Sequence, residues 1–575
     1  MYQQLVLTGI MLTLVGCLFG TKLKPAWLFA AAIGTCFLTG LIELEQMLVN
    51  FANPSLITLI LLVVVSIGIE KTTLVQKLSR SLANGSLLKT VAKLGISTGF
   101  LSSFTNNTAV VATLISAVKD NPTHSPSKLL LPLSYTAILG GTLTLIGTST
   151  NLIVNGFAIE AGMEPLGFFD FTLVGLTAFS IGLVSLLFLV RFLPDNGRAD
   201  QEVVPFYVEG KIQADSKLIG QSVEQNGLRD LKDLFLAEII RAEQRIVAVS
   251  PKEILQQGDI LLFVGDIKSV PLLTQFDGLK VLHDKHDMRI EHLVEVVVSH
   301  SSKNIGKTLK EARFREQFNA AVIAIRRGHD RLQGGLGQIR LQAGDSLILA
   351  PSAKFYDTTD LKREFVYISG LDLQTHLNDK KSFAVLATFI ATLGLGITGI
   401  VPLVKGLLVL LIAYLLTGVV RVNEVKRRFP LELLVVVGSA IGLAKLMIGT
   451  GVASEISNAM LYVLGDFGPY GAFIAIFIMT VIFTELITNN AAAALSFPVA
   501  YALAIGFDVN PLPYIMAVAF GASASFISPF GYQTNLMVYS AGNYRLRDYF
   551  TIGVPMSLIY SITVLTVIPM VFPFK

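Results

Sequence analysis

Two polar triplets interrupt long apolar stretches of the chain, and both read Thr-Asn-Asn. Asn and Thr side chains supply amide and hydroxyl oxygens without a charge. Such oxygens, with backbone carbonyls freed where a membrane helix is broken, suit a hard cation such as Na⁺, and the free helix N-terminus attracts an anion. The triplets therefore favour joint binding of an anion and its coupling cations. They consist of Thr105, Asn106 and Asn107, followed by Thr108, and of Thr488, Asn489 and Asn490.

A second polar segment follows each triplet at nearly the same distance. Asn151 lies 46 residues after Thr105, in GTSTNLIVNG, and Asn535 lies 47 residues after Thr488, in PFGYQTNLMVYSAG. Both segments place glycine and polar residues in apolar surroundings. We therefore expect each to break a membrane helix, with a free helix N-terminus after Asn151 and after Asn535.

Each triplet is expected to meet the second polar segment of its own half, which gives two cation sites flanking one anion. The expected cation ligands are Thr105, Asn106, Gly147, Thr148 and Asn151 at one site, and Thr488, Asn489, Ser528, Gly531 and Asn535 at the other. The expected anion ligands are Thr105, Asn106, Asn107, Thr108, Asn151, Thr488, Asn489, Asn490 and Asn535. Ser134, in a neighbouring apolar stretch, is interpreted as a hydrogen-bonding residue between helices.

The composition is typical of an integral membrane protein. Of 575 residues, 52% are hydrophobic and 15% are charged, whereas soluble domains carry about 25% charged residues. The net charge of +4 is too small to indicate a nucleic-acid partner. No nucleophile, metal-ligand or phosphate-loop motif stands out, so we do not expect an enzyme.

The lengths of the apolar stretches predict spans and hairpins. A span needs about 20 apolar residues. Two stretches, 88–119 and 469–506, are too long for one span and too short for two, so each predicts a re-entrant hairpin whose tip is a triplet. The predicted spans are 3–20, 25–43, 54–70, 128–160 and 172–193 before a polar insert at 197–372, and 380–398, 401–419, 429–449, 511–541 and 550–573 after it.

The distribution of basic residues predicts the orientation. With the N-terminus outside, every basic cluster lies on the cytoplasmic face, including Lys22 and Lys24 early in the chain and 426–428 later. We therefore expect a multi-pass protein of the inner (cytoplasmic) membrane, with 197–372 in the cytoplasm and both termini outside. Five crossings separate corresponding points of the two halves, so the second half is predicted to be inverted relative to the first.

Two hairpins with such tips, each followed by a broken helix, resemble the divalent anion/sodium symporter family over about 1–195 and 375–575. The resemblance implies an elevator-type secondary transporter, usually a homodimer in the lipid bilayer, that moves dicarboxylates, citrate or sulfate with Na⁺. The family's tip motif is usually Ser-Asn-Thr. This chain departs from it at the third position of both tips, Asn107 and Asn490.

The polar insert is predicted to be a tandem repeat with an offset of 86 residues, since 216–220 recurs at 302–306 and 257–262 at 343–348. Each copy is expected to be a small α+β unit, and its pattern resembles the TrkA-C regulatory domain, which in some proteins binds small ligands. The expected domains are 1–196, the first membrane repeat; 197–285 and 286–372, the two TrkA-C-like domains; and 373–575, the second, inverted membrane repeat.

The chain with its insert resembles bacterial and algal permeases associated with sulfate uptake, which favours sulfate as the transported anion. A Na⁺-coupled di- or tricarboxylate symporter is the alternative, and an anion-responsive membrane sensor is a further one. A regulated channel is disfavoured because no TVGYG-like filter is present. Glu485 and Lys445 are ionisable residues within apolar stretches, so either a role in transport or a structural role is open for each, and Glu485 leaves H⁺ coupling open.

Overall fold

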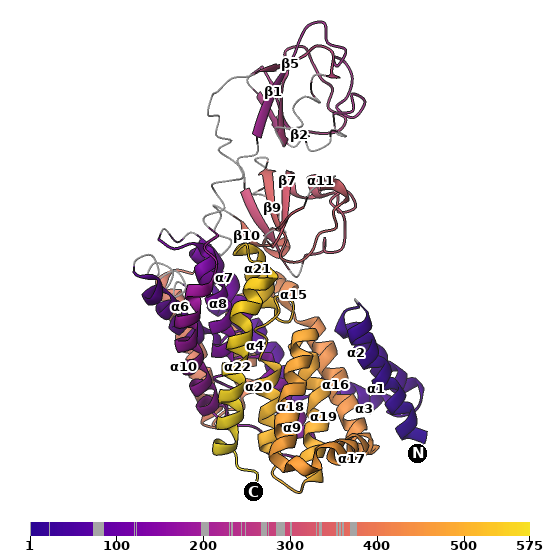
Figure 1. Ribbon diagram of the computed structural model, residues 1–575, viewed down its shortest axis with the longest axis vertical. Helices are drawn as coiled ribbons and strands as arrows, with labels where there is room; N and C mark the ends of the chain where they lie inside the picture. Colours follow the sequence, from indigo (N-terminus) through magenta and orange to yellow (C-terminus); the bar gives the residue numbers. More distant parts are fainter. Residues whose placement is uncertain are drawn as a thin grey trace.

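The computed structural model comprises a helical bundle and two small β units stacked beyond one end of it (Figure 1). Both chain ends lie in the bundle. The structure describes residues 2–21, 23–72, 85–119, 121, 123–196, 206–228, 231, 234–242, 244–247, 249–265, 273, 275–282, 294–299, 302–328, 330–332, 336–351, 355, 358, 361–368 and 377–575.

The helices of the bundle follow the predicted apolar stretches. Before the insert they are α1 (Tyr2–Gly20), α2 (Pro25–Leu38), α3 (Leu44–Phe51), α4 (Pro54–Glu70), α6 (Leu87–Ser102), α7 (Asn107–Lys119), α8 (Pro126–Gly141), α9 (Ser149–Glu160), α10 (Thr172–Leu189) and η1 (Val190–Phe192). After the insert they are α13 (Asp379–Ile397), α14 (Leu403–Leu416), α15 (Val422–Arg428), α16 (Leu431–Gly449), α17 (Val452–Leu464), η6 (Gly465–Phe467), α18 (Gly468–Leu486), α19 (Asn489–Gly506), α20 (Leu512–Ala522), α21 (Gln533–Ala541) and α22 (Leu546–Val571).

The fold is that of a polytopic helical membrane protein. Within the described ranges, seven helical segments are long and apolar enough to cross a membrane, among them α10 and α22. In the described part of the helical bundle, three α-helices lie outside the predicted spans, namely α3, α15 and α17. Each is short, and α3 and α15 carry charged residues, so hydropathy over a full span does not detect them.

The two halves of the bundle repeat one order of elements and pack reciprocally. Helix α2 contacts α16, and α14 contacts α4. In the same way α8 contacts α21, while α20 contacts α9. Each broken helix thus lies against the broken helix of the other half, so segments from both halves meet at the breaks. The inversion of the second half stays a prediction.

Small residues allow α6 and α8 to lie close together. A Cβ atom at Gly140 of α8 would lie 2.5 Å from both the Cα atom and the carbonyl oxygen of Gly99 on α6. Backbone atoms cannot turn aside as a flexible side chain can. The close approach therefore fixes α6, whose end carries the first triplet, against the first broken helix.

Gly140→Ala is expected to destabilise the bundle by about 1–3 kcal/mol or more, the usual cost of overpacking a tight core. The measurement is the unfolding temperature of the purified protein in detergent. Gly394→Ala on α13 is the matched control, because nothing lies within 4 Å of its Cβ position. An unchanged unfolding temperature for Gly140→Ala would contradict the close contact.

The insert forms two antiparallel sheets of five strands each. The first unit contains β1 (Phe206–Ile212), β2 (Leu234–Arg241), β3 (Gln244–Val247), β4 (Ile260–Gly265) and β5 (Leu279–Leu282) in the order β3-β2-β4-β1-β5. The second unit contains β6 (Val294–Val298), α11 (Phe314–Phe318), β7 (Ala320–Arg327), β8 (Asp330–Arg331), η4 (Leu336–Gln338), β9 (Ser346–Pro351), α12 (Leu361–Glu364) and β10 (Phe365–Ile368), with its sheet in the order β10-β6-β9-β7-β8.

The two units have the same strand order and the same internal ion pair. Arg241 is bonded to Asp259 in the first unit, and Arg327 to Asp345 in the second, which is the predicted offset of 86 residues. Both aspartates are fully buried. Each unit also has a hydrophobic core of its own. The predicted domain boundaries at 285/286 and 372/373 lie outside the described residues, as does 197.

Candidate functional site

The first tip, residues 103–106, joins α6 to α7 and is held by its own polar residues. The Thr105 hydroxyl donates to the Leu101 carbonyl oxygen (2.7 Å), and the Thr108 N–H donates to Asn106 Oδ1 (2.8 Å). The Thr144 hydroxyl donates to the carbonyl oxygen of Ser103. Asn106 therefore caps α7, and the tip is bonded to the segment that follows α8.

Asn107, the first residue of α7, connects three parts of the site. With its amide oriented to satisfy both atoms, its oxygen accepts from the Tyr532 hydroxyl (2.8 Å). Its nitrogen then donates to the carbonyl oxygens of Gly147 (3.3 Å) and Ala137 (3.2 Å). The side chain is 3% exposed. A buried amide with its donors and acceptor satisfied fixes the relative position of its partners.

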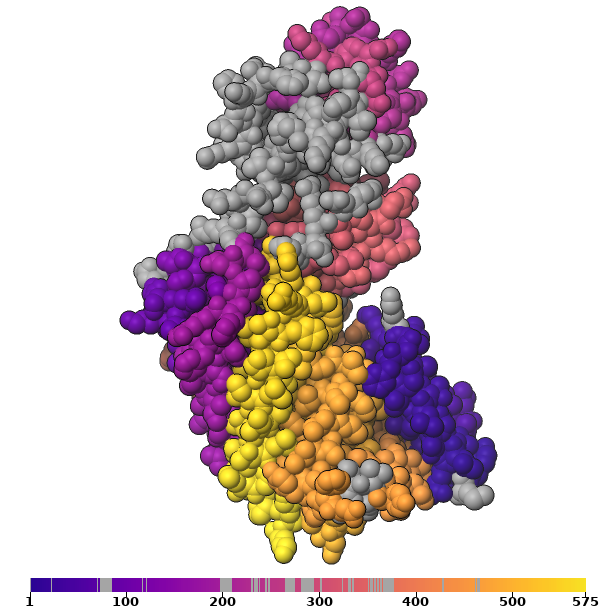
Figure 2. All heavy atoms as spheres, in the orientation of Figure 1, coloured from indigo at the N-terminus to yellow at the C-terminus, as the bar shows by residue number. Residues whose placement is uncertain are grey.

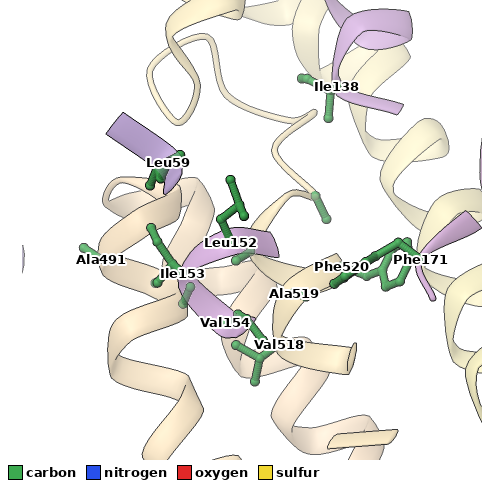
Figure 3. Close-up of a cluster of buried hydrophobic side chains, with 14 of the residues drawn as sticks. Leu59, Ile138, Leu152, Ile153, Val154, Phe171, Ala491, Val518, Ala519 and Phe520 are labelled. Atoms are coloured by element: carbon green, nitrogen blue, oxygen red, sulfur yellow. The ribbon is translucent and has the colours of Figure 1, made fainter. Parts of the chain in front are cut away.

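The first break, residues 142–148, separates α8 from α9. Asn151 Nδ2 donates to the carbonyl oxygen of Thr144 (2.9 Å) and so closes the break onto the first turn of α9. A Cβ at Gly147 would lie 2.5 Å from the carbonyl oxygen of Gly141. Figure 3 shows apolar side chains of α9, such as Ile153, beside those of α20, such as Val518. The start of α9 is thus anchored by packing between the halves.

The second tip, residues 487–488, joins α18 to α19. Thr488 caps α19, since its hydroxyl accepts from the N–H of Ala491 (3.4 Å). The Thr484 hydroxyl lies 2.7 Å from the carbonyl oxygen of Ala522, its acceptor at the end of α20, and 3.0 Å from Asn489 Oδ1. The end of α18, just before this tip, therefore bonds the end of α20.

Glu485 holds the second break, residues 523–532, by an anionic contact. Its Oε1 accepts from the N–H groups of Phe526 and Ile527, both at 2.8 Å, and its Oε2 accepts from the N–H of Ser528 (2.9 Å). Three successive N–H groups form an anion-binding concavity. In this molecule the carboxyl group of Glu485 occupies that concavity and so forms a structural bond at the break.

Asn535 lies fully buried on α21 and binds both halves. Its Nδ2 donates to the carbonyl oxygens of Ser525 (2.9 Å) and Ser528 (3.3 Å), and its Oδ1 accepts from the Ser134 hydroxyl (2.7 Å). The interpretation of Ser134 as a bond between helices is confirmed. The Ser525 hydroxyl is fully buried and has no hydrogen-bond partner among the described residues, so it is available to a ligand.

Two further hydrogen bonds cross between the halves. The Ser149 hydroxyl at the start of α9 donates to Asn490 Oδ1 (2.8 Å). The hydroxyls of Thr150 and Ser523 lie 2.8 Å apart. Together with the Asn107–Tyr532 contact, these bonds gather both tips and both breaks into one polar region between the halves.

The structure bonds the first triplet to the first break through Asn107, whereas the second break is bonded by Glu485 of α18. Two further differences from the prediction concern the helix starts and the opposite half. Helices α9 and α21 begin at Ser149 and Gln533, so the prediction that their N-termini follow Asn151 and Asn535 was wrong by three residues. Both Asn side chains, inside the first turn, instead donate to carbonyl oxygens of the preceding break. The second difference is that the triplets also bond the opposite half, through Asn107 and Asn490.

Several site residues escaped the motif-based prediction. They carry the bonds between the halves or line the second break. Tyr532 lies inside the quoted segment PFGYQTN, so its position there was a usable signal. They are Ser149, Ser523, Ser525 and Tyr532.

Lys445 does not reach this polar region. It forms an ion pair with Glu160 at the end of α9 (2.6 Å), and Asn53 Nδ2 donates to the same carboxylate (2.7 Å). A carboxylate at a helix C-terminus is unfavourable unless it is paired. Lys445 thus links α16 to α9. Within the described residues, no group of three or more His, Cys, Asp or Glu side chains could hold a metal ion.

Comparisons with known proteins indicate a membrane transporter. A citrate transporter family model matches residues 5–509. The chain is 32% identical to a putative sulfur deprivation response regulator of Chlamydomonas reinhardtii, over 92% of this chain and 95% of that protein. It is 32% identical to sodium/sulfate cotransporter 1 of the same alga, over 61% of this chain and 41% of that protein. It is 26% identical to the uncharacterized transporter YfbS of Escherichia coli, over 93% and 94%.

Proposed function

Since the chain belongs to the citrate transporter family, we propose that this membrane transporter, which is not an enzyme, carries sulfate into the cell together with Na⁺. Relatives at 32 to 33% identity are named sodium/sulfate cotransporters, and they match about three fifths of this chain. A secondary transporter of divalent anions with Na⁺ coupling agrees with those names and with the uncharged oxygens of the site.

One observation carries the proposal, namely that two tips and two breaks meet in a single polar region. Four helices, α7, α9, α19 and α21, begin there. Their N-termini supply N–H groups and positive dipole ends for a dianion. Side chains at the starts of these helices, such as Asn106 and Asn489, are partly accessible, whereas Asn151 and Asn535 are buried.

The cations are proposed to bind on either side of the anion. The ligand sets remain those named above, 105–106 with 147–151 and 488–489 with 528–535. We add the Ser525 hydroxyl to the second set, because it lies within the break and is buried with no hydrogen-bond partner among the described residues. Its Oγ would be 2.4 Å from a Cβ at Gly531, so a side chain at that position would displace the hydroxyl. The Glu485 carboxyl group lies next to this set.

A second candidate function is the symport of a di- or tricarboxylate. The family description favours it, since the matching model is that of a citrate transporter. Helix N-termini and Asn side chains can hold a carboxylate as well as a sulfate, so the ligand chemistry is shared.

We propose further that the halves are inverted repeats that work by an elevator-type movement in a homodimer of the inner membrane. The reciprocal packing of α2 on α16 and of α14 on α4 supports the repeat. The termini are placed outside the cell and 197–372 in the cytoplasm, as the basic residues predict. The matching sheets of the insert support the division into 197–285 and 286–372, with TrkA-C-like units as the interpretation.

Radiolabelled sulfate uptake into proteoliposomes, with and without an inward Na⁺ gradient, tests the proposal. Sulfate accumulation that requires Na⁺ and persists in excess unlabelled succinate is the expected result. Uptake of labelled succinate or citrate, with no sulfate uptake, would establish the second candidate instead. Proteoliposomes that contain the Asn489→Ala variant instead of the wild type measure the passive leak of sulfate across the membrane.

A further inference from the structure

The second unit of the insert docks directly on two helices of the proposed transport site. Strand β10 contacts α7, and β6 contacts α21 (Figure 1). In Figure 2 the second unit is seated on the end of α21. The opposite ends of these two helices carry Asn107 and Asn535. One small domain therefore spans a helix of each half behind the proposed cation sites.

Side chains alternate along β6, so one face of the strand packs in the core of the second unit and the other face packs against the helical bundle. Val294, Val296 and Val298 belong to the core of the unit itself. Residues of the opposite face point away from that core, since side chains alternate along a strand. On this face Val297 is fully buried in the hydrophobic cluster of the helical bundle. The docking surface is thus continuous with the membrane part.

Glu295 supplies the polar part of the contact. Its Oε2 lies 2.6 Å from Nζ of Lys119, the last residue of α7, and the two side chains are 17% and 11% exposed. Its Oε1 accepts from the Ser346 hydroxyl (2.7 Å) and lies 3.3 Å from Arg326. Burial raises the pKa of Glu295, but Lys119, Ser346 and Arg326 outweigh it and lower the pKa below its usual value. The carboxylate is therefore charged and paired at neutral pH.

Two turns of the second unit fit against α21. The Gly328 N–H donates to the Ser540 hydroxyl (3.3 Å), and a Cβ at Gly328 would lie 2.7 Å from the Tyr539 ring. A Cβ at Gly344 would lie 3.0 Å from the Leu536 carbonyl oxygen. At both positions a side chain larger than the hydrogen atom of glycine would require Tyr539 or Leu536 to move.

The first unit, which has the same fold, can be compared with the second at the positions that contact the helices. Two of these three positions carry a different residue type in the first unit. At the offset of 86 residues, Val297 corresponds to Lys211, Gly328 to Ala242 and Gly344 to Gly258. Lys211 is exposed, and nothing lies within 4 Å of a Cβ at Gly258. At these two contacts the second unit has an apolar residue, Val297, and a glycine, Gly328. The first unit has the charged Lys211 and Ala242 at the same positions.

We propose that the second unit clamps α7 to α21 and thereby sets the affinity of the transport site for its coupling cation. This inference rests on the proposed function, which identifies the coupling cation as Na⁺. Asn107 begins α7, and Asn535 lies in the first turn of α21. Because the two helices also contact one another, holding their outer ends restricts how far their inner ends separate. Undocking is expected to weaken cation binding without removing any ligand.

Gly328→Ala tests the clamp, since Ala242 shows that alanine is accepted at this turn, with positive φ in both units. Two readouts are needed: hydrogen exchange of 536–541, which reports docking, and the Na⁺ concentration for half-maximal uptake. We expect faster exchange and an increase of at least about fivefold in that concentration, the low end of typical couplings between sites. Gly258→Ala in the first unit is the control and is expected to change neither.

Lys119→Met provides a second variant from the other side of the contact, and Lys217→Met, in an exposed pair with Asp277, is its control. Faster exchange with an unchanged Na⁺ requirement would overturn the proposal, as would unchanged exchange in both docking variants. Na⁺ binding is also measured as the Na⁺ concentration that half-maximally raises the unfolding temperature. If the wild type takes up no anion with Na⁺, the proposed function fails, and this second measurement alone decides the clamp: a shift supports it, and no shift or no Na⁺ effect overturns it.

Discussion

Glu485→Gln is expected to reduce Na⁺-driven uptake by about a hundredfold. The glutamine oxygen can still accept from Phe526 and Ile527, but its amide nitrogen then faces the N–H of Ser528, so a buried donor is left unpaired and a charge is lost. Such a loss costs up to about 3 kcal/mol, and about 1.4 kcal/mol corresponds to a tenfold effect. The measurement is initial uptake in proteoliposomes at saturating anion.

The comparison variant for this experiment is Glu432→Gln. Glu432 pairs with Lys24 at the surface, where both side chains are about two thirds exposed (66% and 65%), so we expect almost no change. Loss of the Glu485 bonds also predicts a lower unfolding temperature, because three N–H groups of the break depend on that carboxylate. Wild-type uptake by Glu485→Gln would show that the break is held without its charge.

Asn106→Ala and Asn489→Ala are each expected to abolish uptake while the protein remains folded. Asn106 caps α7, and Asn489 begins α19, so each side chain lies at a helix start proposed to face the anion. Loss of a capping side chain costs about 1 kcal/mol of helix stability, which a large bundle tolerates. Loss of a ligand oxygen removes binding outright. Uptake and gel-filtration profile are measured together.

Asn458→Ala, at an exposed position of α17, is the control for these two variants and is expected to transport like the wild type. A variant that elutes normally and transports at the wild-type rate would remove that asparagine from the proposed site. Aggregation of both variants would instead indicate that the tips are needed for folding, which the partial exposure of the two side chains argues against.

Much of the fold follows from local sequence. Apolar length predicts the positions of the long helices, and the triplets predict where the hairpins turn, as α6–α7 and α18–α19 show. The repeat in the insert predicts two matching sheets, which have the same strand order. Such features depend on hydropathy, on periodicity and on residues that break helices, all of which are encoded over short distances. Short amphipathic helices such as α3 lack a full apolar span and were missed.

The contacts between the halves could not be read from the motifs. Each triplet was expected to meet the break that follows it; Asn107 does so at Gly147, whereas the second break is bonded by Glu485, which precedes the second triplet. The structure adds the bonds of Asn107 to Tyr532, 425 positions away, and of Ser149 to Asn490, 341 positions away. A linear pattern gives the residue types available for such bonds but not which of them lie within hydrogen-bond distance.

The sequence by itself therefore determines that this is a polytopic helical protein with paired, uncharged polar breaks, because hydropathy and helix-breaking residues act locally. Only the tertiary structure decides which breaks meet, that Glu485 fills the N–H concavity of the second break, and that the second unit of the insert rests on α7 and α21. These outcomes depend on the packing of helices from both halves and on buried polar groups, which bond whatever partner the packing brings within about 3 Å.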